Sequence, residues 1–291
     1  MPTKPLHIIG SQDPRCAQLS KALVELGWNV TTSVDGNWNE KLINKDLVGV
    51  IRSTGISDDN PELKKSNALE VPIYSFAQFV GHLCADKQRI VVAGSHGLRK
   101  IIALVIHILS QYNREFDYSI SYKNNEVLPE IKLTNAPYIL IQGSEVTDPV
   151  SHKPEFMSYQ HHTGVLSGID IKKSALQIRE SDYGNLFKNF ADATPKGGVL
   201  LYNELDPIVK SFFHDKRTDV LQIPFVTPKY EYKNGVAVIK NDSHKQVTVA
   251  LTGSRNMLYI NAAKELVRKL GVTSDNFYDA LTTYAPKQKL A

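Results

Sequence analysis

A short apolar strand, a glycine turn and an apolar helix, in that order, constrain this chain more than any other feature. Ile90–Ala93 is apolar, Gly94 and Gly97 bracket a tight turn, and Ile101–Ile106 is a second apolar run. In this layout the backbone N–H groups of the turn and the helix N-terminus form a cradle for a polyphosphate. The sequence therefore predicts a buried strand, a phosphate-type loop and a buried helix.

The loop lacks the two side chains that phosphate chemistry requires. A working loop has a lysine after the last glycine, which reaches the β/γ-phosphates, and then a serine or threonine that holds Mg²⁺. Here these positions are Leu98 and Arg99. Each helical residue advances by about 100°, so Arg99 and Lys100 point elsewhere than position 98 does. Arg99 could touch a phosphate, but a guanidinium cannot ligate Mg²⁺.

The loop Gly94-Ser95-His96-Gly97 resembles the G-T-H-G-K-T-T loop of the Mur ligases, in particular the branch of UDP-N-acetylmuramate–L-alanine and murein-peptide ligases. Further blocks resemble that family in the same order: an opening strand and turn, an S-x-A-I … N-P-E-L segment, and a G-x-H-N … N-A-x-A-A helix start (Leu6–Gly10; Ile51–Ile56 with Asp59–Leu63; Gly253–Asn256 with Asn261–Ala263).

The resemblance implies an α/β fold in two domains. A Rossmann-like domain of the UDP-sugar-binding type is expected over residues 1–86, and a P-loop-type Mur ligase central domain over 87–291. The family's third, C-terminal ligase domain is expected to be absent. Asp86–Arg89 reads as the short charged link between the two domains.

Strand and helix signals alternate in the first part of the chain, which predicts a parallel sheet with right-handed crossovers. Its first helix is expected to be capped by Asp13, to begin with Pro14 and to stop at Gly27. The strands expected here are Leu6–Ile9, Asn29–Val34, Leu47–Ile51 and Val71–Tyr74.

In the second part, further strands, an Asn234-Gly235 turn and two helices are predicted. The second helix is expected to be capped by Ser274. The strands are Tyr138–Gln142, Thr163–Gly168, Gly198–Asn203, Asp219–Ile223, Val236–Lys240 and Gln246–Leu251, and the helices are Ile260–Leu270 and Ser274–Tyr284.

The turn after the first strand is a candidate substrate site. Of a G-x-G-x-x-G fingerprint only Gly10 remains, but the helix N-terminus favours an anion and Arg15 could add charge. A plain strand-to-helix turn is an equally open interpretation. Asp35 follows the second strand, where an acid can accept a hydrogen bond from a ribose hydroxyl. In the Mur ligases the corresponding acidic residue contacts the uridine end of the ligand, but it aligns with Val34, one residue before Asp35. The alternative interpretation, that Asp35 only forms a turn before Gly36, therefore stays open.

Ser53 and Thr54 match family positions near the UDP pyrophosphate. They follow a strand, at the edge where such sheets usually bind ligands, so the binding interpretation is preferred. The resemblance thus implies UDP-sugar binding by Gly10, Arg15, Asp35, Ser53 and Thr54.

The family's Mg²⁺ and nucleotide residues are only partly retained. Glu145 can match one of two acids and is the one possible catalytic residue, whereas Ser144 takes the other acid's place. Lys172-Lys173 stands where the family has Asp-His, and ammonium groups cannot ligate a cation. Asn256 matches a residue near the nucleotide, but Arg255 replaces its histidine neighbour. Gly94, Ser95, His96, Gly97 and Asn256 are thus a degenerate nucleotide site, with ATP and Mg²⁺ binding predicted weak or lost.

The composition of the chain limits the classes of partner that are expected. The net charge of +4 over 291 residues is mild and scattered, so no nucleic-acid surface is expected. No apolar run approaches the ~20 residues that span a bilayer, so no membrane association is expected. Cys16 and Cys84 form neither a disulfide nor a metal pattern, and no leader is apparent, which favours the cytoplasm. Adjacent residues on a strand face opposite ways, so His161-His162 is not expected to hold a metal.

Three functions compete. The first is a Mur-ligase-like protein without ATP chemistry, which binds a UDP-N-acetylmuramyl ligand and acts alone, as a homo-oligomer or beside a partner ligase. The second is an active ATP-dependent ligase with an altered nucleotide site. The third, an unrelated dinucleotide oxidoreductase, is disfavoured by the broken glycine fingerprint.

Overall fold

The computed structural model describes residues 4–120, 131–174, 176, 178–213, 217–233 and 236–284. The chain forms two compact units, each discontinuous in sequence: the first comprises 1–89 and 116–160, and the second 90–115 and 161–291. The expected continuous domains, 1–86 and 87–291, remain a prediction. In the part of the chain that is described, no helix is long and apolar enough to cross a bilayer.

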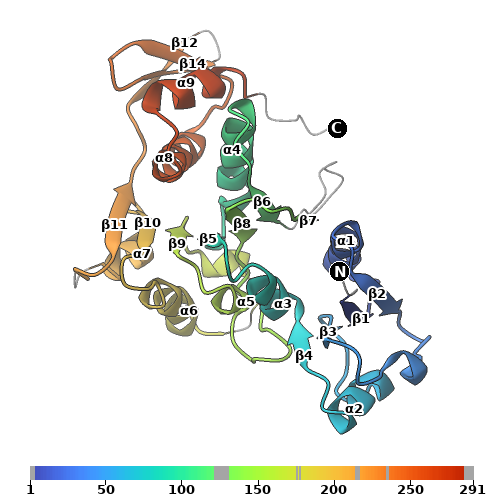
Figure 1. Ribbon diagram of the computed structural model, residues 1–291. Helices are drawn as coiled ribbons and strands as arrows, with labels where there is room; N and C mark the ends of the chain where they lie inside the picture. The colour runs from blue at the N-terminus through green and yellow to red at the C-terminus, as the bar shows by residue number, and fades with distance from the viewer. Residues whose placement is uncertain are drawn as a thin grey trace. The chain divides into compact units, whose positions relative to one another are not determined.

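The first unit contains a four-stranded parallel sheet in the order β2-β1-β3-β4 (Figure 1), which confirms the predicted strand-helix alternation. Its connections carry the helices α1 and α2 and a short 3-10 helix, η1, and the helix α3 follows β4. The bounds are β1 Pro5–Ile9, α1 Pro14–Glu25, β2 Asn29–Ser33, η1 Glu40–Leu42, β3 Gly49–Arg52, α2 Pro61–Ala68, β4 Ile73–Ser75 and α3 Phe76–Leu83.

Local capping explains where these helices begin. Asp13 caps α1 by accepting a hydrogen bond from the Arg15 amide at 2.9 Å, and Pro14 occupies the first helical position, as predicted. Asn60 caps α2 in the same way. Ser75 and Gln78 form a reciprocal capping box at the start of α3.

The described residues of the first unit from 116 onward include three further strands and a short helix. Strand β6 (Asp117–Ser119) pairs in parallel with β8 (Tyr138–Gln142) and antiparallel with β7 (Ile131–Lys132). The helix α5 is Glu155–Ser158. Strand β8 has the bounds predicted from its apolar run, whereas β6, β7 and α5 were not predicted.

A buried polar cluster joins the first sheet to α2. The Glu62 carboxylate accepts hydrogen bonds from Ser33 Oγ and the Asn39 amide, both at 2.6 Å, and lies 3.4 Å from His7 Nε2. His7 Nδ1 lies 2.8 Å from Thr31 Oγ1, so the tautomer protonated at Nε2 satisfies both ring nitrogens. Burial lowers the pKa of His7 although Glu62 opposes the shift, and the ring is neutral in the folded protein at pH 7.

We expect the free energy of unfolding to fall as the pH drops from about 7 to about 5. The unfolded imidazole takes up a proton near its reference pKa of about 6.5, whereas the buried ring does so only at lower pH. The His7 contribution to stability is therefore present above the unfolded pKa and is lost below it, by at most about 1.4 kcal/mol per pH unit. Urea unfolding of the wild type and of His7→Asn across this range measures it, and parallel pH profiles would contradict it.

The second unit contains four parallel strands that pair in the order β11-β10-β9-β5. Residues Ile90–Ala93 of β5 pair with β9, which confirms the strand predicted before the glycine loop. The bounds are β5 Gln88–Ala93, α4 Leu98–Gln111, β9 Thr163–Leu166, η2 Ile171–Lys173, α6 Glu180–Asp192, β10 Val199–Asn203, α7 Pro207–Ser211 and β11 Leu221–Phe225.

A three-stranded antiparallel sheet and two helices complete the second unit. Helix α4 contacts both α8 and α9 (Figure 1). The bounds are β12 Tyr230–Lys233, β13 Val236–Lys240, β14 Gln246–Val249, α8 Ser254–Lys269 and α9 Ser274–Thr282.

The start of α8 and the cap at the start of α9 differ from the sequence prediction. Helix α8 begins at Ser254, before the predicted start at Ile260. Helix α9 is capped by Thr273, whose side chain accepts from the Asn276 amide, and not by Ser274, whose hydroxyl instead donates to Asp242 at 2.6 Å. Serine and threonine are both good caps, so the sequence alone did not distinguish them. The predicted Asn234-Gly235 turn lies outside the described residues.

Candidate functional site

The glycine loop joins β5 to α4 and requires both of its glycines. Gly94 has φ 137° and Gly97 has φ 84°, backbone conformations that other residues rarely adopt. A Cβ at Gly94 would overlap Ser167 Oγ, and one at Gly97 would overlap the ring of Tyr259. The strand–turn–helix layout predicted from the sequence is therefore present, with its glycines under steric constraint.

The loop is fastened to the segment that follows β9. The Ser95 amide donates to the Gly168 carbonyl at 2.9 Å, and Ser95 Oγ accepts from the Asp170 amide at 2.6 Å. Ser167 Oγ donates to the His96 carbonyl at 2.6 Å. The Ser95 amide and hydroxyl are thus committed to protein groups. None of these contacts could be derived from the sequence, because the partners are more than 70 residues apart.

The imidazole of His96 is held by helix α8. Its Nδ1 lies 3.0 Å from the hydroxyl of Tyr259, and the two rings are tilted against each other. Tyr259 is buried, and burial raises the pKa of its hydroxyl, so it remains protonated at neutral pH. His96, which the sequence placed in the nucleotide loop, therefore has a structural partner there.

The first turn of α4 presents no ammonium to the loop at position 98. Leu98 is 8 % exposed and belongs to the core of the second unit. Arg99 and Lys100 are exposed. The Lys100 ammonium donates to Asn256 Oδ1 at 2.7 Å, and Asn256 in turn donates to the Thr252 carbonyl. The structure thus brings Asn256 to the base of α4, near the loop with which the sequence grouped it.

The residues at the expected Mg²⁺ positions belong to different units of the chain. Glu145 lies just after β8 in the first unit and is half-buried, beside Ser144, whose hydroxyl accepts from the Val146 amide. Lys172 is exposed in η2 of the second unit, where its amide donates to Asp170. Among the residues that the structure describes, no group of three or more His, Cys, Asp or Glu side chains is placed to hold a metal ion.

The structure places His161 among protein groups. His161 is buried, its Nε2 lies 2.8 Å from Thr194 Oγ1, and its ring stacks on Phe190. These contacts give His161 a place in the core of the second unit.

The candidate substrate residues of the first unit meet at the carboxyl edge of β1, β2 and β3. Gly10 has φ 85°, and a Cβ there would overlap Ser53 Oγ, so Ser53 supports the turn from beneath and is only 1 % exposed. Arg15 Nη2 donates to Thr54 Oγ1 at 3.2 Å. Asp35 lies in an exposed turn, and its amide donates to the side chain of Gln12 at 3.3 Å. Sequence reasoning therefore selected residues that are close in space.

Arg15 has a partner that the sequence did not indicate. Its guanidinium donates to both oxygens of Glu155, at 2.8 and 3.2 Å, and lies over the ring of Phe76. The Glu155 side chain is 2 % exposed and that of Arg15 20 %. Burial alone would lower the pKa of Arg15, but the bond and charge of Glu155 outweigh it and the pKa is raised. The charge that Arg15 could offer a ligand is thus largely neutralised.

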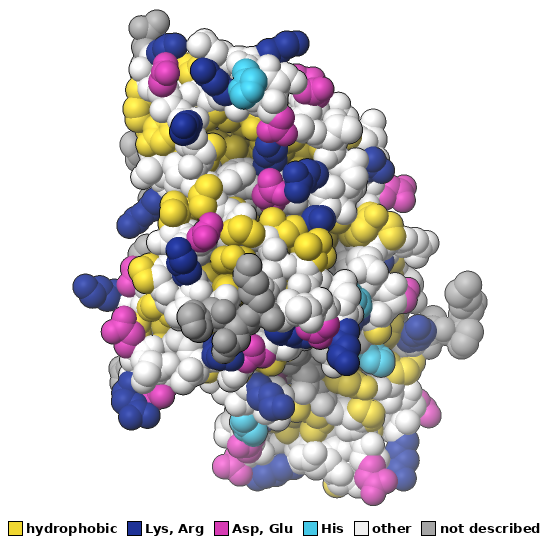
Figure 2. Space-filling view, turned by 90° about the vertical axis from the view of Figure 1, so that its left-hand side faces the viewer, with side chains coloured by type: hydrophobic (Ala, Val, Ile, Leu, Met, Phe, Trp, Pro, Cys, Tyr) yellow, Lys and Arg dark blue, Asp and Glu magenta, His cyan; other side chains and the backbone are white. Residues whose placement is uncertain are grey.

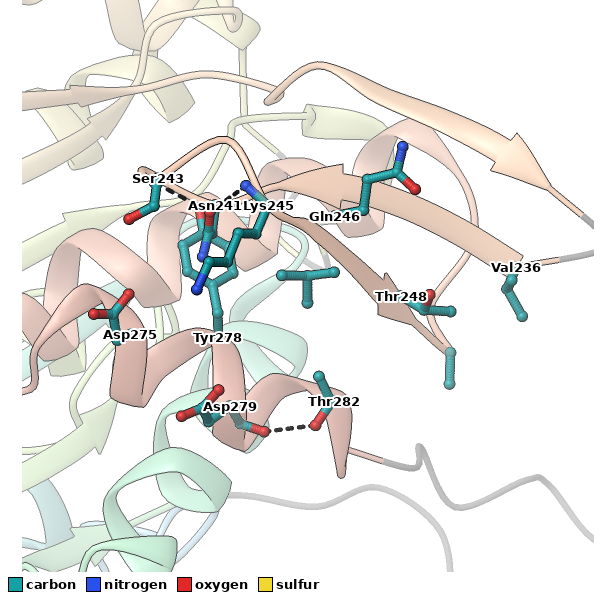
Figure 3. A pocket seen from close by; sticks show the side chains of 12 residues that line it. Val236, Asn241, Ser243, Lys245, Gln246, Thr248, Asp275, Tyr278, Asp279 and Thr282 are labelled. Carbon is teal, nitrogen blue, oxygen red and sulfur yellow. Dashed lines mark hydrogen bonds between the residues drawn. The ribbon is translucent and has the colours of Figure 1, made fainter.

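A polar groove lies in the second unit between the β13–β14 hairpin and α9 (Figure 3). Its volume is about 710 Å³. Asp275, Tyr278 and Asp279 line it from α9, and Lys245 and Thr248 from the hairpin. No residue that the sequence selected as a site residue is among those lining it, so the motifs assign it no role.

Charged side chains of both signs are interspersed on the face of the molecule drawn in Figure 2. This agrees with the mild net charge of +4. The side chains visible on this face therefore do not indicate a polyanionic partner, which a surface of one charge sign would.

Comparison with known proteins finds UDP-N-acetylmuramate–L-alanine ligases among the relatives of this chain. The chain is 24 % identical over 288 residues to UDP-N-acetylmuramate–L-alanine ligase of Caldicellulosiruptor bescii, covering 95 % of this chain and 61 % of that protein. It is 26 % identical over 199 residues to the Clostridium tetani ligase of the same name, covering 68 % of this chain and 41 % of that protein. No family model matches the chain. The chain thus spans about six-tenths or less of the length of these relatives.

Solved structures give the same fold. A UDP-N-acetylmuramate:L-alanyl-γ-D-glutamyl-meso-diaminopimelate ligase from Neisseria meningitides aligns with a TM-score of 0.82 at 15 % identity, covering 99 % of this chain and 100 % of that one. The UDP-N-acetylmuramate–alanine ligase of Thermotoga maritima aligns with a TM-score of 0.67 at 13 % identity, covering 96 % and 68 %. Together with the collinear sequence blocks and the glycine loop, these matches identify the chain as a Mur-ligase-like protein, related to that family in sequence and in fold.

Proposed function

We propose that this chain is a Mur-ligase-like protein without ATP-dependent ligase chemistry, and that its first unit binds a UDP-N-acetylmuramyl ligand or a fragment of one. The single observation that carries the first part is the side chain at position 98. Leu98 lies in the core at the place where a phosphate-binding loop needs a lysine.

Three further features support the loss of ATP chemistry. Arg99 stands where a hydroxyl would hold Mg²⁺, Lys172 stands at a position of the family's Asp-His pair, and both side chains are cationic. The Ser95 amide and hydroxyl are bonded to Gly168 and Asp170. Phosphoryl transfer is catalysed largely by positioning and by neutralisation of charge. Loss of the groups that neutralise it is therefore expected to reduce the rate by several orders of magnitude.

The ligand half of the proposal is supported by the carboxyl edge of the first sheet. Thr54, Arg15 and the Gly10 turn adjoin one another there, as a ligand site of an open parallel sheet requires. The amides of Gly10 and Ser11 both donate to the Ser33 carbonyl, and Arg15 is paired with Glu155. We therefore expect weaker pyrophosphate binding than a complete glycine-rich turn gives.

The alternative function is an active ligase with an altered nucleotide site. It is favoured by the constrained geometry of Gly94 and Gly97, which an abandoned loop would not need to keep. A second copy of the chain, or a partner ligase, is the proposed protein partner in either case. The cytoplasmic location expected from the sequence stays a prediction.

Ligand titration and a ligation assay separate the two functions. We expect UDP-N-acetylmuramate to bind in calorimetry, and Arg15→Ala to change its affinity. Mixing the protein with ATP, Mg²⁺, UDP-N-acetylmuramate and L-alanine or the murein tripeptide should release no phosphate above the blank. ATP-dependent amide formation would establish the alternative, and absence of UDP-N-acetylmuramate binding would refute the ligand half alone.

A further inference from the structure

A separate cavity of about 550 Å³ lies in the first unit, between β4, α3 and the segment from residue 151 to residue 160. This volume falls within the range of small-molecule sites. None of the residues selected from the sequence as site residues lines it, and no step of the proposed function uses it.

The lining of this cavity is basic. It includes the side chains of His82, Arg89 and Lys153, and none of the described lining residues is acidic. The Asp148 carboxylate is buried and accepts hydrogen bonds from Ser75 Oγ and from Ser158 Oγ, which belongs to a lining residue. A cavity lined by one sign of charge concentrates ligands of the opposite sign.

The Arg89 guanidinium donates hydrogen bonds to backbone carbonyl groups beside the cavity. This buried group donates to the carbonyls of Cys84 and Ala85 at the end of α3, at 3.1 and 2.7 Å. It also donates to those of Tyr159 and Gln160, at 2.9 and 3.1 Å. Carbonyls at a helix C-terminus repel anions. With four of them bonded to a cation, this repulsion is removed from the cavity wall.

The walls are held in place by close packing. A Cβ at Gly81 of α3 would lie 2.5 Å from the carbonyl oxygen of Ser158, the last residue of α5, so the two helices approach as closely as glycine permits. Tyr74 packs against Gly49 and makes an edge contact with Phe79. The imidazole of His82 stacks on Tyr74, with ring centroids 5.9 Å apart. An aromatic platform thus adjoins the basic groups.

We propose that this cavity binds a small organic anion, whose phosphate or carboxylate group is held by Lys153 and His82 and whose flat or apolar part lies against Tyr74 and Met157. Lysine and histidinium donate charge-assisted hydrogen bonds to such groups. Aromatic faces and thioethers accept flat ligands. The proposal is independent of UDP-sugar binding at the Gly10 turn.

Phenyl phosphate is the probe. Inorganic phosphate and phenol, which carry only its anionic group and only its aromatic ring, are the comparison ligands. We expect phenyl phosphate to bind more tightly than either comparison ligand in calorimetry at about pH 6.5. Lys153→Ala and His82→Gln should each weaken it about tenfold, since each variant removes one hydrogen bond between charged groups. Lys45→Ala, which removes another exposed lysine of the same unit, is the matched control and should leave the affinity unchanged.

Three results would overturn the proposal: phenyl phosphate binding no better than phenol, affinity that survives the double variant of Lys153 and His82, or equal weakening by Lys45→Ala. Unfolding temperatures of all variants should match the wild type, because both side chains are exposed. Arg15→Ala should leave phenyl phosphate binding intact, which separates this site from the Gly10 turn.

Discussion

Replacing Glu155 with alanine is expected to destabilise the protein by about 3 kcal/mol or more. The substitution removes both bonds from the Arg15 guanidinium to the Glu155 carboxylate, although the Arg15 side chain is only 20 % exposed, and leaves the bond to Thr54 and the 3.8 Å contact with Asp13. Removing one partner of a buried ion pair typically costs about 3–5 kcal/mol, because the other charge stays in a poorly solvated place. Urea unfolding followed by circular dichroism measures the change.

The matched control is Asp182→Ala, which breaks the exposed Arg179–Asp182 pair on α6. Exposed pairs contribute about 0–1 kcal/mol, so this variant should unfold almost as the wild type does. The double variant Arg15→Met with Glu155→Leu should recover part of the loss, because it removes both charges together. Equal effects of Glu155→Ala and Asp182→Ala would show that the Arg15–Glu155 pair is not held as described.

Alanine at Gly97 is expected to cost about 2–5 kcal/mol. The residue has φ 84°, where an L-residue costs about 1–2 kcal/mol, and its Cβ would overlap the buried ring of Tyr259. Overpacking adds about 1–3 kcal/mol. Thermal unfolding gives the loss, and the environment of the His96 imidazole, read by NMR, should change with it because His96 lies against the same tyrosine.

Gly197→Ala isolates the steric part of this effect. Gly197 has φ 76°, but a Cβ there meets nothing within 4 Å, so only the conformational strain applies. We expect a loss of about 1–2 kcal/mol. Were Gly97→Ala no worse than Gly197→Ala, the close approach of the loop to α8 would be wrong.

The elements that the sequence predicted well have local signals. The cap and first residue of α1, Asp13 and Pro14, are adjacent, and β8 and β13 are short apolar or alternating runs bounded by turn residues. Helix α6 was missed although Tyr183 and Phe187 stand at helical spacing on its buried face. Its short apolar groups are separated by charged and polar residues, which weakened the pattern.

The contacts that define the two sites could not be derived in this way. Arg15 and Glu155 are 140 residues apart, and Ser95 and Asp170 are 75 apart. Neither pair leaves a pattern in its own segment, because only the strand order brings the partners together. A buried glutamate needs hydrogen-bonding or charged partners, but the sequence does not say which residues they are. The sequence thus indicated where ligand residues meet, and the structure adds which of them are already bonded within the protein.

The account rests on the claim that the glycine loop no longer binds Mg²⁺-ATP, and calorimetry of the unmodified protein tests this most directly. We predict a dissociation constant weaker than about 1 mM, an affinity of no more than about 4 kcal/mol. Leu98→Lys combined with Arg99→Thr should tighten binding, since the constraints on Gly94 and Gly97 keep the loop in shape. Micromolar binding of Mg²⁺-ATP by the unmodified chain would contradict the proposed loss of ATP chemistry.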